Sequence, residues 1–223
     1  MSKSMTVLIA GATGNTGRPL VEQLLALGHR VRVIVRSRER LPAEVLEHPN
    51  ITVVEASILE LSDKQMGDCV QGCDAVVSCL GHVINFKGIF GDPKKLCTDA
   101  TRRLCAAIES NRPSVPTKFI LMNTVGVPNP DLKEERTWFE RCVLTLLRWF
   151  LPPHNDNESA AQHLHAGVGT ENAYLEWCSV RPDSLINAEV SPYDVTESPV
   201  TGLFTGRPTT RSNVAHFMTQ LMQ

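Results

Sequence analysis

The chain lacks a strong excess of either charge and lacks a long apolar run. Its 223 residues carry 22 Lys and Arg against 24 Asp and Glu, which gives a net charge of −2. Because no basic surface of any size is indicated, we expect no nucleic-acid partner. No apolar stretch is long enough to cross a bilayer, so we also expect no membrane partner.

Cysteine is present, but its arrangement excludes two of its common uses. The seven cysteines are an odd number, and none is spaced as Cys-x-x-Cys. This pattern argues against a disulfide framework and against a zinc site, so we expect no metal. Reduced cysteines, together with an N-terminus that does not read as a signal peptide, predict a cytoplasmic protein.

The strongest positive signal is the stretch from residue 6 to residue 36. An apolar run at 6–10 precedes the sequence Gly-Ala-Thr-Gly-Asn-Thr-Gly, and apolar residues at helical spacing then continue up to Gly28. A second strand pattern at 30–36, in which Arg alternates with Val and Ile, completes a strand–loop–helix–strand unit. This unit is typical of a dinucleotide-binding fold.

The three motif glycines have separate expected roles. Gly11 permits the tight turn out of the strand, Gly14 lets the backbone approach a pyrophosphate, and Gly17 lets the helix pack closely on the sheet. The N-terminus of that helix offers free N–H groups and a partial positive charge to phosphates. Further hydrogen bonds to the cofactor are expected from three polar residues of the loop: Thr13, Asn15 and Thr16.

The end of the second strand predicts which cofactor is bound. NAD-binding folds usually carry Asp or Glu there to hold the ribose 2′-hydroxyl, whereas this chain has Arg36, Ser37 and Arg38. A guanidinium matches phosphate oxygens as a two-point donor, so these residues favour a 2′-phosphate and therefore NADP(H). The alternative is that the arginines form a solvated turn.

Strand and helix patterns alternate along the rest of the chain. Strands are expected at 51–56, 74–80, 118–122 and 175–180, and helices at 39–48, 62–70, 96–111, 134–151, 154–166 and 213–222. The alternation predicts an α/β fold, a Rossmann-type doubly wound parallel sheet, as one domain over residues 1–223. Residues 187–210 are rich in Pro, Gly, Ser and Thr and predict a small irregular C-terminal lobe.

Residues that follow the strands are candidates for the cofactor site, because ligands of open α/β sheets lie at the carboxyl ends of the strands. They are Ser57 after the third strand, Leu80, Gly81 and His82 after the fourth, and Asn123 and Thr124 after the fifth. Ser57 is placed towards the adenine, and His82 beside the cofactor. A loop histidine without a role in binding is the alternative for His82.

The expected helix at 134–151 has an apolar stripe, which consists of Trp138, Phe139, Cys142, Val143, Leu146, Leu147 and Phe150. Such a stripe can form a dimer interface or lie on a membrane surface, but packing against the body of the domain is favoured. Two caps are also expected, from Asp156 for the helix at 154–166 and from Ser212 for the last helix.

These motifs together resemble the NmrA-like NAD(P)H-binding group of atypical short-chain dehydrogenase/reductases. The glycine motif, Arg36, the fourth strand with the sequence DAVVSCLG, and the turn Val180-Arg181-Pro182 carry the resemblance. It implies that Arg181 and Pro182 lie beside the nicotinamide. The small flavin and biliverdin-IX-beta reductases look similar in size and layout.

One departure concerns the Tyr-x-x-x-Lys motif of the wider superfamily, whose Tyr donates a proton to the substrate. The only tyrosines here are Tyr174 and Tyr193, and no lysine follows Lys133. Aligning the later helix by its apolar pattern puts Pro153 and Asn157 in the two motif positions. Asn157 is therefore expected to hold the nicotinamide ribose in place of the Lys.

Two residues are left as candidates for catalysis. Thr124 takes the place of the usual Ser and could bind a substrate carbonyl, or it could only satisfy the strand end. His154 could be a general acid, or a helix-entry residue. Two functions follow as alternatives: an NADPH-dependent oxidoreductase with a small carbonyl, quinone or flavin acceptor, or a non-catalytic NADP(H) sensor. A small-molecule substrate is expected, and a homodimer or a protein partner stays open.

Overall fold

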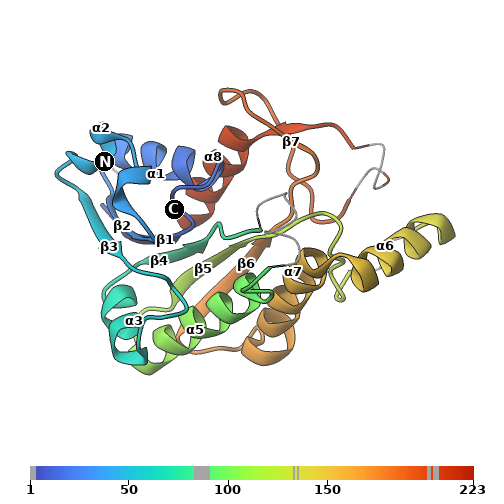
Figure 1. Cartoon of the computed structure of the whole chain (residues 1–223), viewed down its shortest axis with the longest axis horizontal. Helices are drawn as coiled ribbons and strands as arrows, with labels where there is room; N and C mark the ends of the chain where they lie inside the picture. Colours follow the sequence, from blue (N-terminus) through green and yellow to red (C-terminus); the bar gives the residue numbers. More distant parts are fainter. Residues whose placement is uncertain (1–3, 83–90, 133, 135, 200–201, 203–205) are drawn as a thin grey trace.

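The computed structural model describes residues 4–82, 91–132, 134, 136–199, 202 and 206–223. At its centre lies a parallel sheet of six strands in the order β3-β2-β1-β4-β5-β6 (Figure 1). The strands are β1 (Thr6–Ala10), β2 (Arg30–Val35), β3 (Ile51–Glu55), β4 (Ala75–Ser78), β5 (Thr117–Met122) and β6 (Leu175–Val180). The predicted doubly wound α/β fold is confirmed, and each strand lies within about two residues of its predicted bounds.

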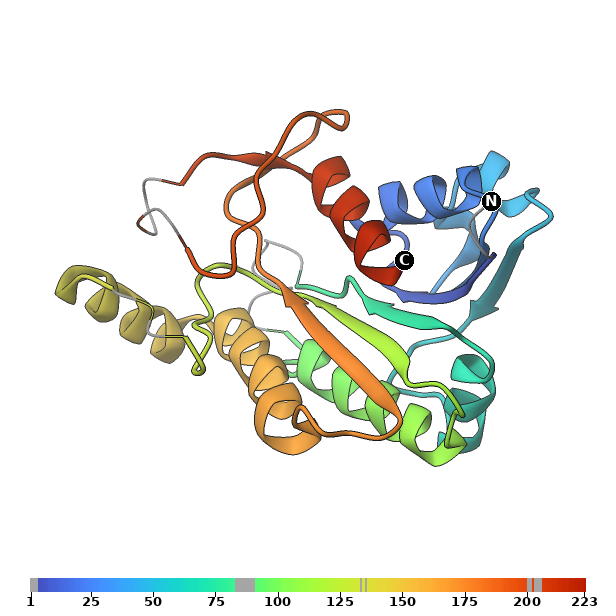
Figure 2. The same cartoon turned by 180° about the vertical axis from the view of Figure 1, so that it is seen from behind.

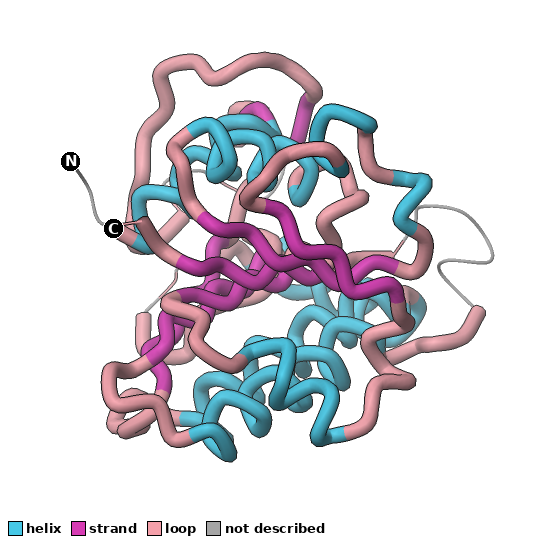
Figure 3. The backbone as a smooth tube through the Cα atoms, turned by 90° about the vertical axis from the view of Figure 1, so that its left-hand side faces the viewer, coloured by secondary structure: helices cyan, strands magenta, loops and turns pink. Residues whose placement is uncertain are grey.

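Helices cover both faces of this sheet (Figures 1 and 3). One layer contains α1 (Gly17–Ala26) and α8 (Arg211–Met222), and the other contains α3 (Asp63–Val70), α5 (Leu96–Asn111) and α7 (Pro152–Gln162). Ser62 caps α3 and forms a capping box with Gln65. The alternation of strand and helix along the chain therefore puts apolar helix faces on both sides of every central strand.

The first strand shows how the sequence divides between the two cores. Val7 and Ile9 point towards α1 and α8, whereas Leu8 and Ala10 point towards α3 and α5. All four side chains are fully buried. Because helices cover both faces of this strand, its side chains are buried on both sides and do not alternate between apolar and polar. This explains the continuous apolar run in the sequence.

The sheet has its topological switch point between β1 and β4. The chain leaves β1 towards β2 on one side and leaves β4 towards β5 on the other. The N–H of Cys79, just after β4, donates to the carbonyl of Ala10 at 2.8 Å. The two strand ends are thus joined where an open α/β sheet places its ligand.

The predicted helix at 39–48 is wrong in its bounds. The structure has a single 3₁₀ turn, η1 (Arg38–Arg40), followed by a short helix, α2 (Ala43–Leu46). Pro42 stands between them in an extended conformation as the N-cap of α2. Its fixed ring and missing N–H prevent a continuous helix across this point.

Both of the predicted caps named above are wrong. The last helix begins at Arg211, and the hydroxyl of Thr210 rather than Ser212 accepts the N–H of Asn213 at 2.9 Å. The helix expected from residue 154 starts at Pro152, because proline is well suited to the first helical turn. It continues into a π-helical turn, η2 (His163–Val168), and Asp156 lies inside the helix rather than at its start.

The helix expected at 134–151 is α6 (Trp138–Phe150), and its predicted packing on the body of the domain is wrong. Thr137 and Glu140 form a capping box that fixes its first residue. From there α6 projects away from the sheet and its two helix layers (Figures 1 and 2). Most of its large apolar side chains are exposed.

The described residues of the C-terminal lobe are largely irregular, as predicted. Its regular part is a parallel pair of two-residue strands, β7 (Leu185–Ile186) and β8 (Thr209–Thr210). The lobe passes over the carboxyl side of the sheet before α8 returns to the layer of α1 (Figure 1). Among the described residues, no helix has the length and apolar character needed to cross a membrane.

Candidate cofactor site

The glycine loop turns tightly against the end of β4. Gly11 has φ +85°, and a Cβ at this position would lie 2.5 Å from the carbonyl oxygen of Cys79. A Cβ on Gly17 would collide with the backbone of Gly11. Gly14 differs, since a Cβ there would meet only the carbonyl oxygen of Gly11, at 3.2 Å. Two glycines thus serve packing, and the third leaves its outer side open to a ligand.

The start of α1 completes this loop as an anion site. Thr16 is the N-cap residue and is nearly buried, yet its side chain makes no capping hydrogen bond in the part of the chain described. In the first turn of α1 the N–H of Arg18 donates to the carbonyl of Gly14 at 2.9 Å, and Pro19 has no N–H. The Gly17 amide is therefore the group of this turn that is left to bind a phosphate oxygen. Thr13 is half-buried and Asn15 is exposed on the same loop.

The residues predicted to bind a 2′-phosphate follow the strand beside β1. Arg36 and Arg38 are exposed and Ser37 is half-buried, directly after β2. The register pairs Ala10 with Ile34, which brings the end of β2 beside the glycine loop. The N–H of Arg38 donates to Glu55 at the end of β3 at 3.4 Å, whereas the guanidiniums of Arg36 and Arg38 remain at the surface. Half-buried Ser57 follows β3.

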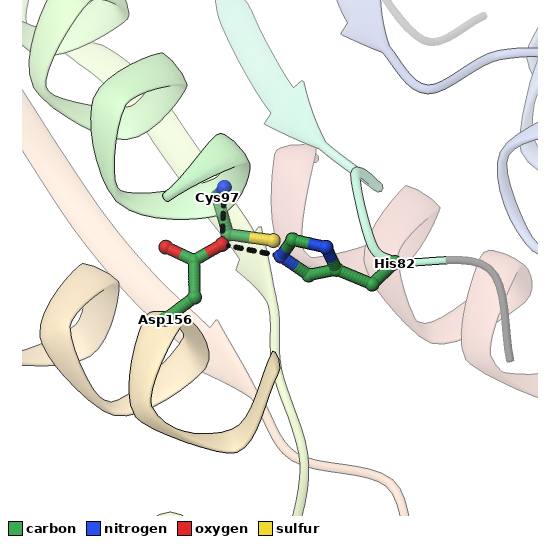
Figure 4. Close-up of side chains that lie close together, drawn as sticks. All are labelled: His82, Cys97 and Asp156. Carbon is green, nitrogen blue, oxygen red and sulfur yellow. Dashed lines mark hydrogen bonds and ion pairs between the residues drawn. The ribbon is translucent and has the colours of Figure 1, made fainter. Parts of the chain in front are cut away.

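His82 is held by a buried carboxylate that the sequence did not connect with it. Its Nε2 lies 2.8 Å from Oδ2 of Asp156, and both side chains are almost fully buried (Figure 4). The same carboxylate accepts the N–H groups of Cys97 and Thr98, at 2.7 and 2.9 Å, and the Thr98 hydroxyl at 2.6 Å. Asp156 therefore caps α5 and fixes the chain after β4, instead of capping its own helix.

The charge state of Asp156 follows from these contacts. Burial acts to raise the pKa of its carboxyl group. Hydrogen bonds from Thr98, His82 and the backbone of Cys97 act in the opposite direction and prevail, so the pKa lies below its usual value. With an acceptor-only carboxylate on this side, Nε2 of His82 is the donor.

Cys97 completes the cluster. Its thiol donates to the carbonyl of Leu80 at 3.5 Å, and burial, followed by the nearby Asp156, raises its pKa well above the ordinary value. His82, Cys97 and Asp156 are residue types that bind metals, and their ligand atoms lie within 4.8 Å of one another. A metal would have to displace the cap of α5, so the arrangement is that of a hydrogen-bonded network.

Asn123 and Thr124 follow β5, and the side chain of each forms a hydrogen bond with a neighbouring backbone group. The amide group of Asn123 donates to the carbonyl of Asn157 at 3.0 Å, which brings Asn157 to the carboxyl end of the sheet. The Thr124 hydroxyl accepts the N–H of Gly126 at 3.3 Å. A hydroxyl that accepts one hydrogen bond can still donate another, so the predicted contact of Thr124 with a substrate stays a prediction.

His154 lies beneath the loop that follows β5. It is 8% exposed, and a Cβ on Gly126 would lie 3.4 Å from its ring carbon Cε1. Burial lowers the pKa of His154; Glu158 opposes this shift and Arg148 adds to it. The imidazole is thus biased towards its neutral form, and its role as a general acid stays a prediction.

The lowered pKa of His154 gives a pH-dependent stability. Because the folded pKa lies below the unfolded value of about 6.5, the unfolded chain binds more protons between the two values. The contribution of neutral His154 to the unfolding free energy is therefore fully present above the unfolded pKa, and it is lost as pH falls through the folded pKa. We expect His154→Gln to flatten the decline of unfolding free energy between about pH 7 and pH 5, measured by urea denaturation.

The same variant at alkaline pH is the control for this measurement. Above pH 7 both states hold His154 neutral, so the difference between the variant and the unchanged protein should not vary with pH there. Equal slopes for the two proteins at acidic pH would show that His154 does not carry the effect.

The turn after β6, at Arg181 and Pro182, forms hydrogen bonds with the loop that follows β5. The guanidinium of Arg181 donates to Glu134 at 2.6 Å and to the carbonyl of Val127 at 2.8 Å, and the carbonyl of Pro182 accepts the N–H of Val125 at 3.1 Å. Arg181 thus has protein partners in this structure. Its predicted contact with the nicotinamide, like that of Pro182, stays a prediction.

An open cavity of about 1670 Å³ lies between these loops and the C-terminal lobe. Its walls come from the segments 125–132, 177–183 and 191–199 and from the helices α7 and α8. Among the described residues that line it, none belongs to the glycine loop. The cavity therefore lies on the β6 side of the sheet, away from the glycine loop.

Comparisons with known proteins show the family of this chain and proteins of similar fold. A family model described as NAD(P)H-binding matches residues 11–223. An uncharacterized chloroplastic protein of Arabidopsis thaliana is 32% identical over 125 residues, which are 56% of this chain and 43% of that protein. The chloroplastic divinyl chlorophyllide a 8-vinyl-reductase of Cucumis sativus is 26% identical over 142 residues, 60% of this chain and 32% of that enzyme.

Among solved structures, a short-chain dehydrogenase/reductase from Veillonella parvula in complex with NADP is similar in fold. The TM-score is 0.70 at 17% identity, over 99% of this chain and 88% of that one. This chain spans less than half the length of the two plant relatives that it matches. Because the family model covers nearly all of the sequence, the chain belongs to the NAD(P)H-binding family.

Proposed function

We propose that the chain is an NADPH-dependent oxidoreductase that reduces a small carbonyl, quinone or flavin acceptor. The observation that carries the proposal is the glycine loop at the switch point, with Arg36 at the end of the neighbouring strand. The open side of Gly14 has the space that a pyrophosphate needs, because a Cβ there would have one close neighbour.

The residues present fit NADPH at each of its charged groups. The open side of Gly14 and the Gly17 amide at the start of α1 would hold the pyrophosphate, and Arg36, Ser37 and Arg38 would hold the 2′-phosphate. Asn157 would face the nicotinamide ribose from α7. The Veillonella parvula protein of similar fold is in complex with NADP, which supports this assignment.

When bound, NADPH supplies the hydride. The protein binds the cofactor, orients the acceptor beside it and shields the two from water. Thr124 would orient the acceptor oxygen with its hydroxyl hydrogen. His154, held neutral under Gly126, would take part in proton movement only through its ring N–H. Flavins and quinones can take their proton from water, which suits a site without the Tyr-x-x-x-Lys motif.

A non-catalytic NADP(H) sensor is the second candidate function. One observation favours it: Pro153 lies in the first turn of α7, at the position aligned with the catalytic Tyr, and its side chain has no acidic proton to donate. A sensor would bind the cofactor through the same glycine loop. It would report the redox state to a partner rather than turn over an acceptor.

The cofactor assignment predicts a selective effect of Arg36→Ser. Loss of charge-assisted hydrogen bonds to a 2′-phosphate should weaken NADPH binding roughly tenfold or more, with NADH binding nearly unchanged. Calorimetric titration of both nucleotides measures this. The control is Arg30→Ser, at the opposite end of the same strand, which should alter neither affinity.

Equal losses for NADPH and NADH in Arg36→Ser would contradict the assignment of the 2′-phosphate site. Turnover then separates the two functions. Consumption of NADPH with flavin or quinone acceptors supports the oxidoreductase, whereas tight binding of NADPH without turnover of any acceptor class supports the sensor.

A further inference from the structure

Helix α6 presents a broad apolar face to solvent. The exposed fractions are 76% for Trp138, 55% for Phe139, 57% for Leu146, 78% for Trp149 and 69% for Phe150. Cys142 is exposed on the same face. We propose that this face is a self-association surface, on which α6 of a second copy of the chain packs antiparallel about a two-fold axis. The proposal is independent of the proposed function.

The opposite side of α6 holds it to the rest of the chain. Glu140 is buried, and a Cβ on Gly126 would lie 3.8 Å from the Leu144 side chain. Arg148 pairs with Glu158 of α7 at 2.6 Å. Because these contacts lie on the inner side, the orientation of α6 is fixed while its outer side is left exposed.

The area of this face matches the requirement of a stable dimer. An aromatic side chain offers roughly 150–250 Å², so four aromatics with these exposures, together with Leu146, expose roughly 600 Å². Monomeric proteins rarely expose an apolar patch of this size without a partner. Two copies would bury roughly 1,200 Å², the lower end of specific interfaces.

The face is also self-complementary. Its residues are placed symmetrically about position 144, so that Trp138 corresponds to Phe150, Phe139 to Trp149, and Cys142 to Leu146. At about 100° per residue, all six fall within one arc of the helix. A two-fold axis through the midpoint would set aromatic against aromatic at both ends and smaller side chains at the centre. An isologous contact requires this reciprocity.

A second copy fits the face better than a lipid surface does. Helices that lie on membranes carry a polar face rich in Lys and Arg. The basic residues of α6 are Arg141 and Arg148, and the latter is already neutralised by Glu158. A face that is aromatic and poor in charge is instead typical of the core of a protein interface.

The first test is the molar mass of the full chain by light scattering or sedimentation. We expect a dimer at concentrations on the order of 100 µM, and Trp149→Glu should halve the mass with little change in circular dichroism. The control is Val115→Glu, which changes an equally exposed apolar side chain away from α6 and should leave the dimer intact.

The second test fixes the register through the pairs that the symmetry predicts. In a Cys142→Ser background, we expect Trp138→Cys and Phe150→Cys proteins to form a disulfide-linked pair when mixed, and much less when either is oxidised alone. A monomer at all concentrations, a dimer that survives Trp149→Glu, or equal cross-linking of the separate proteins would overturn the proposal. Vesicle binding by a monomer would assign the face to lipid instead.

Discussion

Replacing Gly11 by alanine is expected to cost about 4 kcal/mol of unfolding free energy, from the left-handed backbone and from overpacking. Gly11 has φ +85°, and its Cβ would lie 2.5 Å from the carbonyl oxygen and 2.6 Å from the carbonyl carbon of Cys79. Neither neighbour can move without breaking the junction of β1 and β4. Since domains are stable by only about 5–15 kcal/mol, urea denaturation should show most of the stability lost.

Gly28 provides the matched control for this prediction. It has φ +79°, but a Cβ there would meet no atom within 4 Å among the described residues. Gly28→Ala should therefore cost only the conformational term, about 1–2 kcal/mol. Equal losses for the two variants would show that the close approach of Cys79 does not constrain the loop.

The second large effect is expected for Asp156→Ala. The carboxylate accepts four hydrogen bonds, from the His82 ring, the Cys97 and Thr98 amides and the Thr98 hydroxyl. Its loss would leave these buried donors unsatisfied and α5 uncapped, at a cost of about 3 kcal/mol or more. Asp63→Ala removes an exposed carboxylate from the first turn of α3, where it lies 3.7 Å from Arg103, and should change stability by less than about 1 kcal/mol.

The pH dependence makes this prediction specific to the charged carboxylate. The pKa of Asp156 is lowered in the folded protein, so its contribution is present above the unfolded pKa of about 3.9 and is lost as pH falls through the folded value. The difference in unfolding free energy between Asp156→Ala and the unchanged protein should therefore become smaller below about pH 4. A gap that stays constant down to acid unfolding would contradict the charged cap.

The parts of the fold that sequence could predict are those fixed by local pattern. A short apolar run before Gly11 and helical spacing after Gly17 require no knowledge of distant residues. The link between His82 and Asp156 joins residues that are 74 positions apart, and nothing in the local pattern of either reports the other. The nearby Pro and Asn residues made Asp156 look like a cap for its own helix.

Helix α6 shows a different limit of sequence reasoning. Its apolar stripe predicts a helix correctly, because periodicity follows from the helix itself. A helix that packs on the body of its own domain and a helix that packs on another molecule have the same apolar stripe in their sequences. The structure distinguishes the two, because α6 begins after Thr137 and projects away from the sheet and its helix layers (Figure 2).

The packing of α8 against α1 has a consequence for synthesis on the ribosome. Val214 and Met218 of α8 share one core with Leu20 and Leu24 of α1, and the Lys118 side chain binds the last carbonyls of α8. At about 5–20 residues per second, α8 emerges roughly 10–40 s after α1. During that interval the apolar face of α1 lacks the helix that covers it in the folded protein, so this face is accessible to a chaperone that binds nascent chains.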